Sequence, residues 1–381
     1  MTQEPFGDIP LFREIQRLLA AGGGPINYEI ARQVAGAVAA QGRTATRPSP
    51  ESSRALDVAV HRSETIVSGY TRLPLEEPLQ AKLVDRSWWI SSTLESWKWL
   101  LEHLARRFLG EMGRVGQPEE TAGNPLQGAM EQIAPLLLGI QVGTLMGNLA
   151  REQLGRYDLP IPRDDEGHLF VVGENVEALA ADYGVPADRV QQWIALNEVA
   201  RGLVFRQVQW LNRYFRGLLT ELVDSIEIDT AALERRLMDL QAGGMESLEE
   251  SMNVQEAIPI VPSDRHRRAL DNIQAFVALL EGYARNASSQ VAEEVVEEPS
   301  KIDEIMIRRA TTPTDGERLL SGLLGLSFDR ALEQSGATFC AAVVSLKGLP
   351  ALNRVWEAPD NLPTLAEIKD PFQWIERVLE S

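Results

Sequence analysis

The chain has 381 residues, 44% of them hydrophobic and 24% charged, which is the composition of a globular protein with a sizeable core. Lys and Arg number 37 against 55 Asp and Glu, and the net charge of −18 repels phosphate backbones and anionic lipid, so we expect no nucleic-acid partner and no membrane binding. The single cysteine, Cys340, excludes a disulfide framework. Because the first residues also lack the basic and then apolar pattern of a signal peptide, we expect a cytoplasmic protein.

The first third of the chain is predicted to be helical. Apolar residues recur at helical spacing over 12–21, and the three glycines that follow end this helix. Asn27 is expected to cap a helix that extends to about Ala40. Further helices are predicted at about 53–69, 77–84 and 86–113, with loops at 41–53 and 113–125.

The longest uncharged run, 133–150, has Gly139, Gly143 and Gly147 at four-residue spacing. Such spacing lets helices approach closely, in membranes and in soluble cores alike. The run is marginal in length for a membrane span and is interrupted by Pro, Gln, Thr and Asn. We therefore favour a buried, tightly packed helix over a transmembrane one.

A short β element is predicted next, followed by helices to the end. Residues 159–162 and 168–172 flank a polar turn, as in a hairpin. Asn175 is expected to cap a helix and Gly184 to end it. Pro186 is expected to open the next helix. Residues 241–263 are expected to form a mobile connection, and further helices are predicted at about 264–296, 316–333 and 335–347.

The helix opened by Pro186 contains the outline of a zinc-protease motif. In HExxH, histidines at i and i+4 share a helical face and hold Zn²⁺, and the Glu between them is the general base for a zinc-bound water. Here Asn197 and Arg201 occupy the ligand positions, and Glu198 stands where the base would be. Asn is a poor zinc ligand and Arg cannot ligate, so no metal is expected. Taken alone, this pentapeptide is more typical of a solvated helical face.

Short motifs elsewhere in the sequence favour the interpretation of this pentapeptide as a degenerate zinc-protease motif. They lie, in order, at 6–12, 85–89, 154–162, 197–201, 280–283, 353–356, 362–364, 367–368, 370–371 and 374–375. The ordered set resembles a zincin-like metallopeptidase family of unknown function, whose members are described as hydrolases or as associated with deazaflavin-coenzyme biosynthesis. The resemblance covers nearly the whole chain and implies a zincin-like core. It also implies zinc as the cofactor of the family, although its histidine ligands are missing here.

The departures from the family pattern cluster at the implied site. Besides Asn197 and Arg201, Tyr283 stands where the family usually has His. Glu281 is kept, and the resemblance implies that it is the third, carboxylate ligand position. Because an unpaired charge is costly away from water, we expect Arg201 to pair with Glu281 or with Glu198 if its face of the helix is buried. The alternative is that Arg201 lies on an exposed face.

These observations predict a mainly α protein with a small β-sheet or hairpin, of the α+β class. Residues 1–115 are expected to form an N-terminal helical region, and 116–381 a zincin-like region with the motif helix at about 186–224. The two are expected to pack as one compact unit.

Three functions are compatible with this pattern. The favoured one is a catalytically inactive pseudo-peptidase that keeps a cleft for an unknown protein, peptide or small molecule, with Glu198 as a vestigial base. The second is a metallopeptidase-like hydrolase that uses a non-standard site or a metal held elsewhere. The third is a structural or interaction protein that kept only the fold. The pattern names neither a ligand nor an oligomeric state.

Overall fold

The structure is a computed structural model. It describes residues 24–41, 48–74, 77–112, 125–227, 229, 261, 263–325 and 330–380, with the backbone alone for 111–112, 125–132 and 330. The helix predicted at 12–21, the linker after 112 and nearly all of the connection predicted at 241–263 lie outside these residues.

Side-chain caps begin the helices of the N-terminal part, as Asn27 was expected to do. Its side chain accepts a hydrogen bond from the N–H of Ile30, and Ser49 and Asp85 cap two later helices in the same way. The helix predicted at 86–113 is interrupted at Trp97, whose backbone leaves the helical region. The helices are α2 (Tyr28–Ala39), α3 (Pro50–Thr71), α4 (Arg86–Ser96) and α5 (Lys98–Met112).

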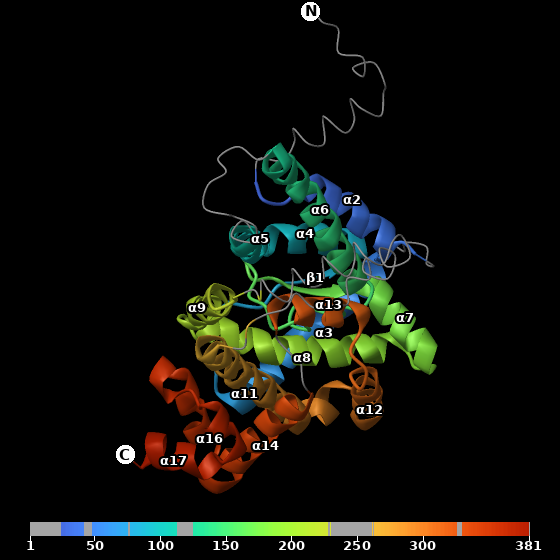
Figure 1. The fold of residues 1–381 in the computed structure, drawn as a ribbon. Coiled ribbons are helices and arrows are strands. Elements are labelled where there is room, and N and C mark those ends of the chain that lie inside the picture. The colour runs from blue at the N-terminus through green and yellow to red at the C-terminus, as the bar shows by residue number, and fades with distance from the viewer. Residues whose placement is uncertain are drawn as a thin grey trace, which may run out of the picture.

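The apolar run forms the second part of α6 (Pro125–Ala150), which packs against α2 (Figure 1). A Cβ atom on Gly139 would lie 2.6 Å from the carbonyl oxygen of Asn27, and one on Gly143 would lie 2.6 Å from that of Ala31. The predicted close packing of these glycines is therefore confirmed. By length and mean hydropathy (1.5), Ile133–Ala150 is also the one candidate membrane span among the described residues.

The sheet consists of two parallel strands, β1 (Ala81–Val84) and β2 (Leu169–Val172), with Ala81 opposite Leu169. Two predictions are therefore wrong. The helix predicted at 77–84 is in part strand β1, and residues 168–172 pair with it instead of forming a hairpin with 159–162. A small sheet in a mainly helical protein is nevertheless what the composition and patterning predicted.

The motif lies on α8 (Ala187–Gln207), which follows α7 (Gly173–Tyr183) after a turn at Gly184. Gly184 has φ 62°, a left-handed conformation that suits glycine, and it ends α7 as predicted. The helix predicted at 186–224 is two helices, because the chain leaves the helical path at Val208 before α9 (Leu211–Asp224). Asn175 does not cap α7; its buried amide donates to the carbonyl oxygens of residues 150 and 153.

The C-terminal part wraps around α11, a helix of 32 residues that Ser263 caps. Gly282 allows a close contact with a later helix, since a Cβ on Gly282 would lie 2.2 Å from the backbone of Gly336. The elements are α11 (Asp264–Val295), α12 (Pro299–Arg309), α13 (Asp315–Leu324), α14 (Arg330–Lys347), α15 (Leu349–Leu352), the 3-10 helices η1 (Asn353–Trp356) and η2 (Pro359–Asn361), α16 (Leu365–Lys369) and α17 (Pro371–Leu379).

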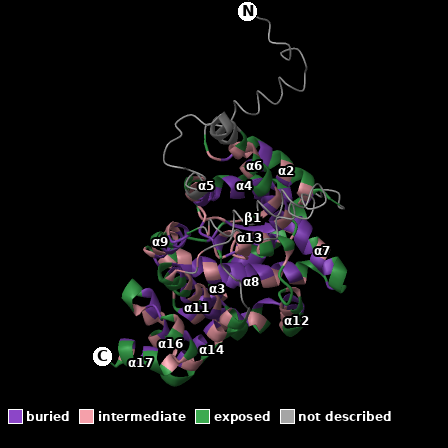
Figure 2. Cartoon of the chain, in the orientation of Figure 1, coloured by how far each residue is buried: buried purple, intermediate pink, exposed green. Residues whose placement is uncertain are grey.

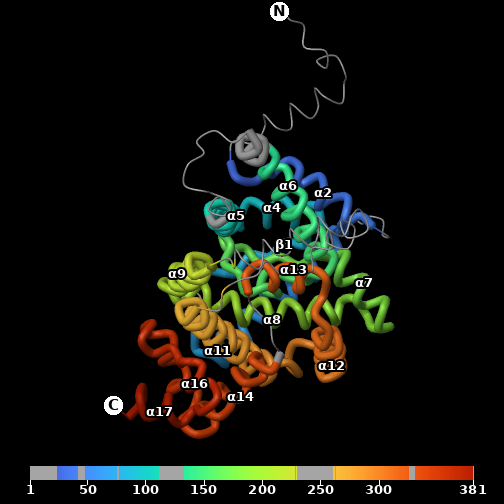
Figure 3. The backbone as a smooth tube through the Cα atoms, viewed as in Figure 1, coloured from blue at the N-terminus to red at the C-terminus, as the bar shows by residue number. Residues whose placement is uncertain are grey.

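Helix α8 crosses the middle of the molecule and is buried over most of its length (Figure 2). It contacts α3, α7, α11, α12 and β2. The backbone trace shows α3 from the N-terminal part beside α11 from the C-terminal part (Figure 3). The motif on α8 is therefore held between segments that are far apart in the sequence.

Candidate functional site

The motif residues lie in the buried middle of α8. Asn197 is 9% exposed and Glu198 is 1% exposed, whereas the side chain of Arg201 keeps 17% of its surface in contact with solvent. The face that carries them is packed between neighbouring helices and is not a solvated surface. The alternative of an exposed Arg201 is therefore wrong.

Arg201 forms an ion pair with Glu281 of α11. Its Nε lies 3.0 Å from Oε1 and its Nη2 lies 2.5 Å from Oε2 of the carboxylate, so the guanidinium binds through two parallel hydrogen bonds. Burial by itself would lower the pKa of Arg201, but the Glu281 carboxylate more than offsets it and the pKa lies above its ordinary value. The contact expected between these two residues is present, and it joins α8 to α11.

Glu198 is bound by backbone N–H groups and does not pair with Arg201. Its carboxylate accepts hydrogen bonds from the N–H of Arg156 at 2.8 Å and the N–H of Tyr157 at 3.0 Å. Burial, followed by the nearby charge of Asp158, raises the pKa of Glu198 to about 8, although Arg201 and the two N–H donors oppose that shift. In this arrangement Glu198 fixes the turn that follows α6.

The two other candidate residues also have partners. The Asn197 side chain donates to the carbonyl oxygen of Trp193 at 2.9 Å, one helical turn back. Tyr283, which is 2% exposed, donates to Oδ1 of Asn353 at 2.8 Å, and its ring meets Trp356 edge-on. Burial raises the pKa of Tyr283 well above its usual range. Tyr283 therefore anchors the C-terminal segment to α11.

Beside the ion pair lies a cavity of about 190 Å³. Glu281 and Leu280 line it from α11, and Gly202 and Phe205 line it from α8. Opposite these helices is the segment 156–167, in which the ring of Tyr157 stacks on Phe205 with centroids 5.1 Å apart. The candidate site is thus a small cleft with an aromatic wall next to the Arg201–Glu281 pair.

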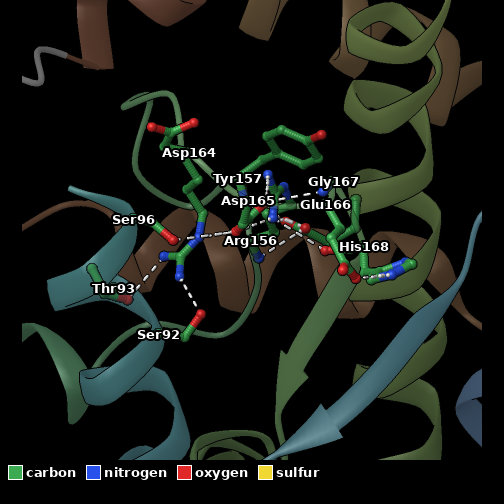
Figure 4. A network of polar contacts seen from close by, with 12 residues as sticks. Ser92, Thr93, Ser96, Arg156, Tyr157, Asp164, Asp165, Glu166, Gly167 and His168 are labelled. Atoms are coloured by element: carbon green, nitrogen blue, oxygen red, sulfur yellow. Dashed lines mark hydrogen bonds and ion pairs between the residues drawn. The ribbon is translucent and has the colours of Figure 1, made fainter. Parts of the chain in front are cut away.

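Two buried arginines, Arg156 and Arg163, also line this cleft. Figure 4 shows the network of polar contacts around Arg156 and Asp165. Arg156 and Arg163 both bind Asp165, at 2.7 and 3.0 Å, and Arg163 also donates to the hydroxyl groups of Ser92 and Thr93 at 2.8 Å each. Burial lowers the pKa of Arg163 to about 10, and the arginines hold the pKa of Asp165 far below its usual range despite burial. The sequence of 163–167 predicts only a polar turn; the signal for an ion-pair network is the presence of arginines and carboxylates in the same short segment.

The side chains at the motif do not fit a zinc ion. A permanently charged guanidinium occupies one ligand position and is bonded to the carboxylate that would be the third ligand. Throughout the described ranges, no group of three or more His, Cys, Asp or Glu side chains is placed to hold a metal ion. The motif residues as they stand therefore offer no zinc site.

Two candidate nucleophiles elsewhere in the described part of the chain are shielded. Ser225 and His266 lie 2.9 Å apart, but Ser225 is fully buried, and its hydroxyl also bonds the carbonyl oxygen of Leu222. Cys340 is also fully buried, and burial raises the pKa of its thiol well above the usual range. Neither residue is placed to attack a substrate from solvent.

Fold and site together define a mainly helical, zincin-like protein whose central helix carries the motif. The chain belongs to the zincin-like metallopeptidase family, whose profile matches residues 26–375. A solved structure from Chloroflexus aurantiacus, described as a putative hydrolase with a novel fold, is 25% identical with a TM-score of 0.65, over 92% of this chain and 98% of that chain. No curated protein matches the chain.

Proposed function

We propose that this protein is a catalytically inactive member of its family, a pseudo-peptidase that keeps the cleft as a binding site. The ion pair between Arg201 and Glu281 carries the proposal, because it occupies the position where the motif would place a metal and two of its ligands. No cofactor is needed in this arrangement. A cytoplasmic location fits the single reduced cysteine.

The guanidinium replaces part of the electrostatic role of a metal. It brings one positive charge against Glu281 and fixes the carboxylate through directional hydrogen bonds instead of coordination. It also donates to the carbonyl oxygen of Asn197, so Arg201 joins the three vestigial ligand positions, Asn197, Arg201 and Glu281. What is lost is a Lewis acid that could activate water, and with it the hydrolytic chemistry of the family.

The charges around the cleft indicate a neutral ligand. The lining carries three arginines and three carboxylates and so has no net charge: Arg156, Arg163 and Arg206 against Asp165, Glu166 and Glu281. Apolar and aromatic side chains make up the rest of the contact surface. A cavity of about 150 Å³ can hold a benzene molecule. We therefore propose a neutral, partly apolar group of about that size, presented by a protein, a peptide or a small molecule.

Restoring the histidines tests the proposal directly. We expect the wild-type protein to hold no stoichiometric metal when it is purified with and without added Zn²⁺ and analysed by elemental mass spectrometry. The double variant Asn197→His and Arg201→His is expected to bind about one zinc per chain, since Glu281 is then free to act as the third ligand.

The matched control adds Glu281→Ala to the double variant and is expected to lose most of this zinc affinity. One zinc tightly bound to the wild-type chain would overturn the proposal of an inactive protein. A double variant that folds without gaining a metal would show instead that Asn197 and Arg201 are not the vestigial ligand positions.

A working hydrolase is the second candidate, because the related Chloroflexus protein is described as a putative hydrolase. It would need a non-standard site or a metal held elsewhere. A screen with ester, amide and phosphoester substrates tests this candidate. Turnover by the wild-type protein would favour it over the inactive pseudo-peptidase; turnover that survives a chelator would indicate a non-standard site, and turnover that the chelator removes would indicate a metal held elsewhere.

A further inference from the structure

The cleft beside the Arg201–Glu281 pair has two sides of different chemistry. Phe205 of α8 and Leu280 of α11 contribute apolar side chains on one side. The segment 156–167 lies opposite and contributes the guanidinium group of Arg156, whose side chain is 7% exposed. A ligand in the cleft therefore meets hydrophobic surface on one side and a buried cation on the other.

The acceptor that faces this arginine is already fully used. Oδ1 of Asp165 accepts hydrogen bonds from Nη2 of Arg156 at 2.7 Å and from the N–H of Gly167 at 3.0 Å. Its Oδ2 accepts from Nη1 of Arg156 at 2.9 Å and from Nε of Arg163 at 3.0 Å. Because each carboxylate oxygen has two lone pairs, Asp165 has none left for a further donor.

One donor of Arg156 is left over. Its Nε–H is buried, and no atom of the described residues accepts a hydrogen bond from it. The neighbouring Tyr157 does not fill this role, although the centre of its ring lies 5.5 Å from Cζ of the guanidinium. Arg163, in contrast, bonds through each of its nitrogen atoms. A buried donor without an acceptor is costly, so a ligand that supplies an oxygen atom here would be stabilised.

The charge of the lining favours a neutral acceptor over an ionised one. Its arginines and carboxylates are equal in number, so a ligand carboxylate would gain no net attraction. Asp165 already binds the other edge of the Arg156 guanidinium, and its negative charge would repel a second carboxylate. A carbonyl oxygen accepts the hydrogen bond without bringing a net charge.

We propose that the cleft binds a neutral carbonyl compound, a ketone, an ester or an amide, whose oxygen accepts from Nε of Arg156. Its apolar part packs against Phe205 and Leu280. This inference rests on the binding function proposed above and assigns the chemistry of the ligand. Nε is shielded from solvent, so the hydrogen bond displaces no water from the arginine. The ring of Tyr157, which lies over the guanidinium and lines the cleft, shifts to admit the oxygen.

Three probes of nearly equal shape test this assignment on the whole chain. Acetophenone carries the carbonyl group, α-methylstyrene has a CH2 group in place of the oxygen, and benzoate carries a full negative charge. We expect acetophenone to bind about ten-fold or more tightly than either of the others, because a hydrogen bond from a charged donor is worth at least about that factor. Ligand-observed NMR titration measures the three dissociation constants.

The outcomes separate this proposal from the function on which it rests. Equal binding of acetophenone and α-methylstyrene, or tighter binding of benzoate, would overturn the carbonyl ligand and still show that the cleft binds small molecules. Failure of all three probes to bind would overturn the carbonyl ligand and count against a binding cleft. The zinc measurements on the wild-type protein and the histidine variants decide separately whether the protein is inactive.

The Nε–H resonance of Arg156 in ¹⁵N-labelled protein locates the contact without any substitution in the protein being titrated. Acetophenone should shift this resonance to a saturating value, and α-methylstyrene should shift it much less. Arg156→Lys identifies the resonance by its loss and should remove the preference for acetophenone. Arg189→Lys is the matched control, since Arg189 also forms ion pairs but lies outside the lining of the cleft. A preference that survives Arg156→Lys, or a resonance that acetophenone leaves unmoved, would overturn the proposal.

Discussion

Because Gly155 has no side chain, it leaves the space that the Glu198 carboxylate occupies. A Cβ atom on Gly155 would lie 2.5 Å from Oε1 and 2.6 Å from Cδ of the Glu198 carboxylate. The carboxylate cannot easily move aside, because the N–H groups of Arg156 and Tyr157 hold it. The residue that resembles a general base is thus part of a compact structural contact between α8 and the turn at 154–158.

Gly155→Ala is expected to destabilise the protein by about 1–3 kcal/mol, the usual cost of an overpacked contact. Urea unfolding followed by circular dichroism measures the change. Gly217→Ala is the control, since Gly217 lies within α9 with no atom within 4 Å of the added Cβ. It should be neutral or stabilising by about 0.5–1 kcal/mol. Equal effects of the two substitutions would contradict the contact described at Gly155.

The raised pKa of Glu198 predicts a pH dependence of stability. In the folded protein this group keeps its proton up to a pH of about 8, whereas in the unfolded chain it ionises near its ordinary pKa of 4.5. Between these values the folded state binds more protons, so its contribution to the free energy of unfolding is complete below pH 4.5 and is lost as pH rises towards 8.

Urea unfolding at several pH values between 5 and 8 tests this linkage. Glu198→Gln is expected to flatten the fall in stability with rising pH, although the amide leaves one N–H donor without an acceptor and lowers stability overall. Glu64→Gln is the control, because Glu64 is also a buried carboxylate that accepts a backbone N–H, that of Leu79. A slope that Glu198→Gln leaves unchanged would show that Glu198 does not titrate in this range.

At the scale of the element, several helix pairs rely on glycine for close approach, among them α2 with α6 and α11 with α14. In the first pair, a Cβ on Gly143 would lie 2.6 Å from the carbonyl oxygen of Ala31 and 2.7 Å from Cβ of Val34. Both contacts are with atoms that cannot rotate away. The helices would have to separate to accept any larger residue.

Gly143→Ala is therefore expected to lower the free energy of unfolding by about 1–3 kcal/mol, even though alanine favours helix formation by about 1 kcal/mol over glycine. Gly69→Ala in α3, where nothing lies within 4 Å of the added Cβ, provides the baseline for the helix-propensity effect alone. Thermal unfolding of the three proteins gives the comparison. A Gly143→Ala protein at least as stable as Gly69→Ala would contradict the close approach.

Elements with local signals were predictable from sequence, and elements that depend on distant partners were not. Asn27 as a cap and Gly184 as a stop act through their own backbone neighbours, so the ends of α2 and α7 were predicted closely. Strand β1 has only four residues, and its partner begins at residue 169. Four residues carry too little periodicity to distinguish a strand from a helix, and the pairing that decides between them is non-local.

The candidate site shows the same division. The i and i+4 spacing of Asn197 and Arg201 placed both on one face of a helix, and the contact with Glu281 was expected from the cost of burying an unpaired charge. The cluster of Arg156, Arg163 and Asp165 was missed. Its hydroxyl partners come from α4, which sequence spacing cannot bring next to residue 163.

At the scale of the whole molecule, the buried hydrophobic residues form two clusters, and these clusters meet at the sheet and at α8. Val84, Phe170 and Val172 belong to one cluster, whereas Leu169 and Val171 belong to the other, because successive side chains of a strand point to opposite faces. The sheet thus lies between the two hydrophobic clusters, and the alternating side chains of its strands pack into both of them.

The two strands of this sheet are also synthesised at different times. Strand β1 ends at residue 84 and β2 begins at residue 169, so β1 leaves the ribosome long before its partner exists. At about 5–20 residues per second, translating the roughly 85 residues between them takes about 4–17 s. During this interval the nascent chain has α3 and α4 but no β2 against which to close its second core. The backbone groups on this edge of β1 therefore have no strand partner until residues 169–172 have been synthesised.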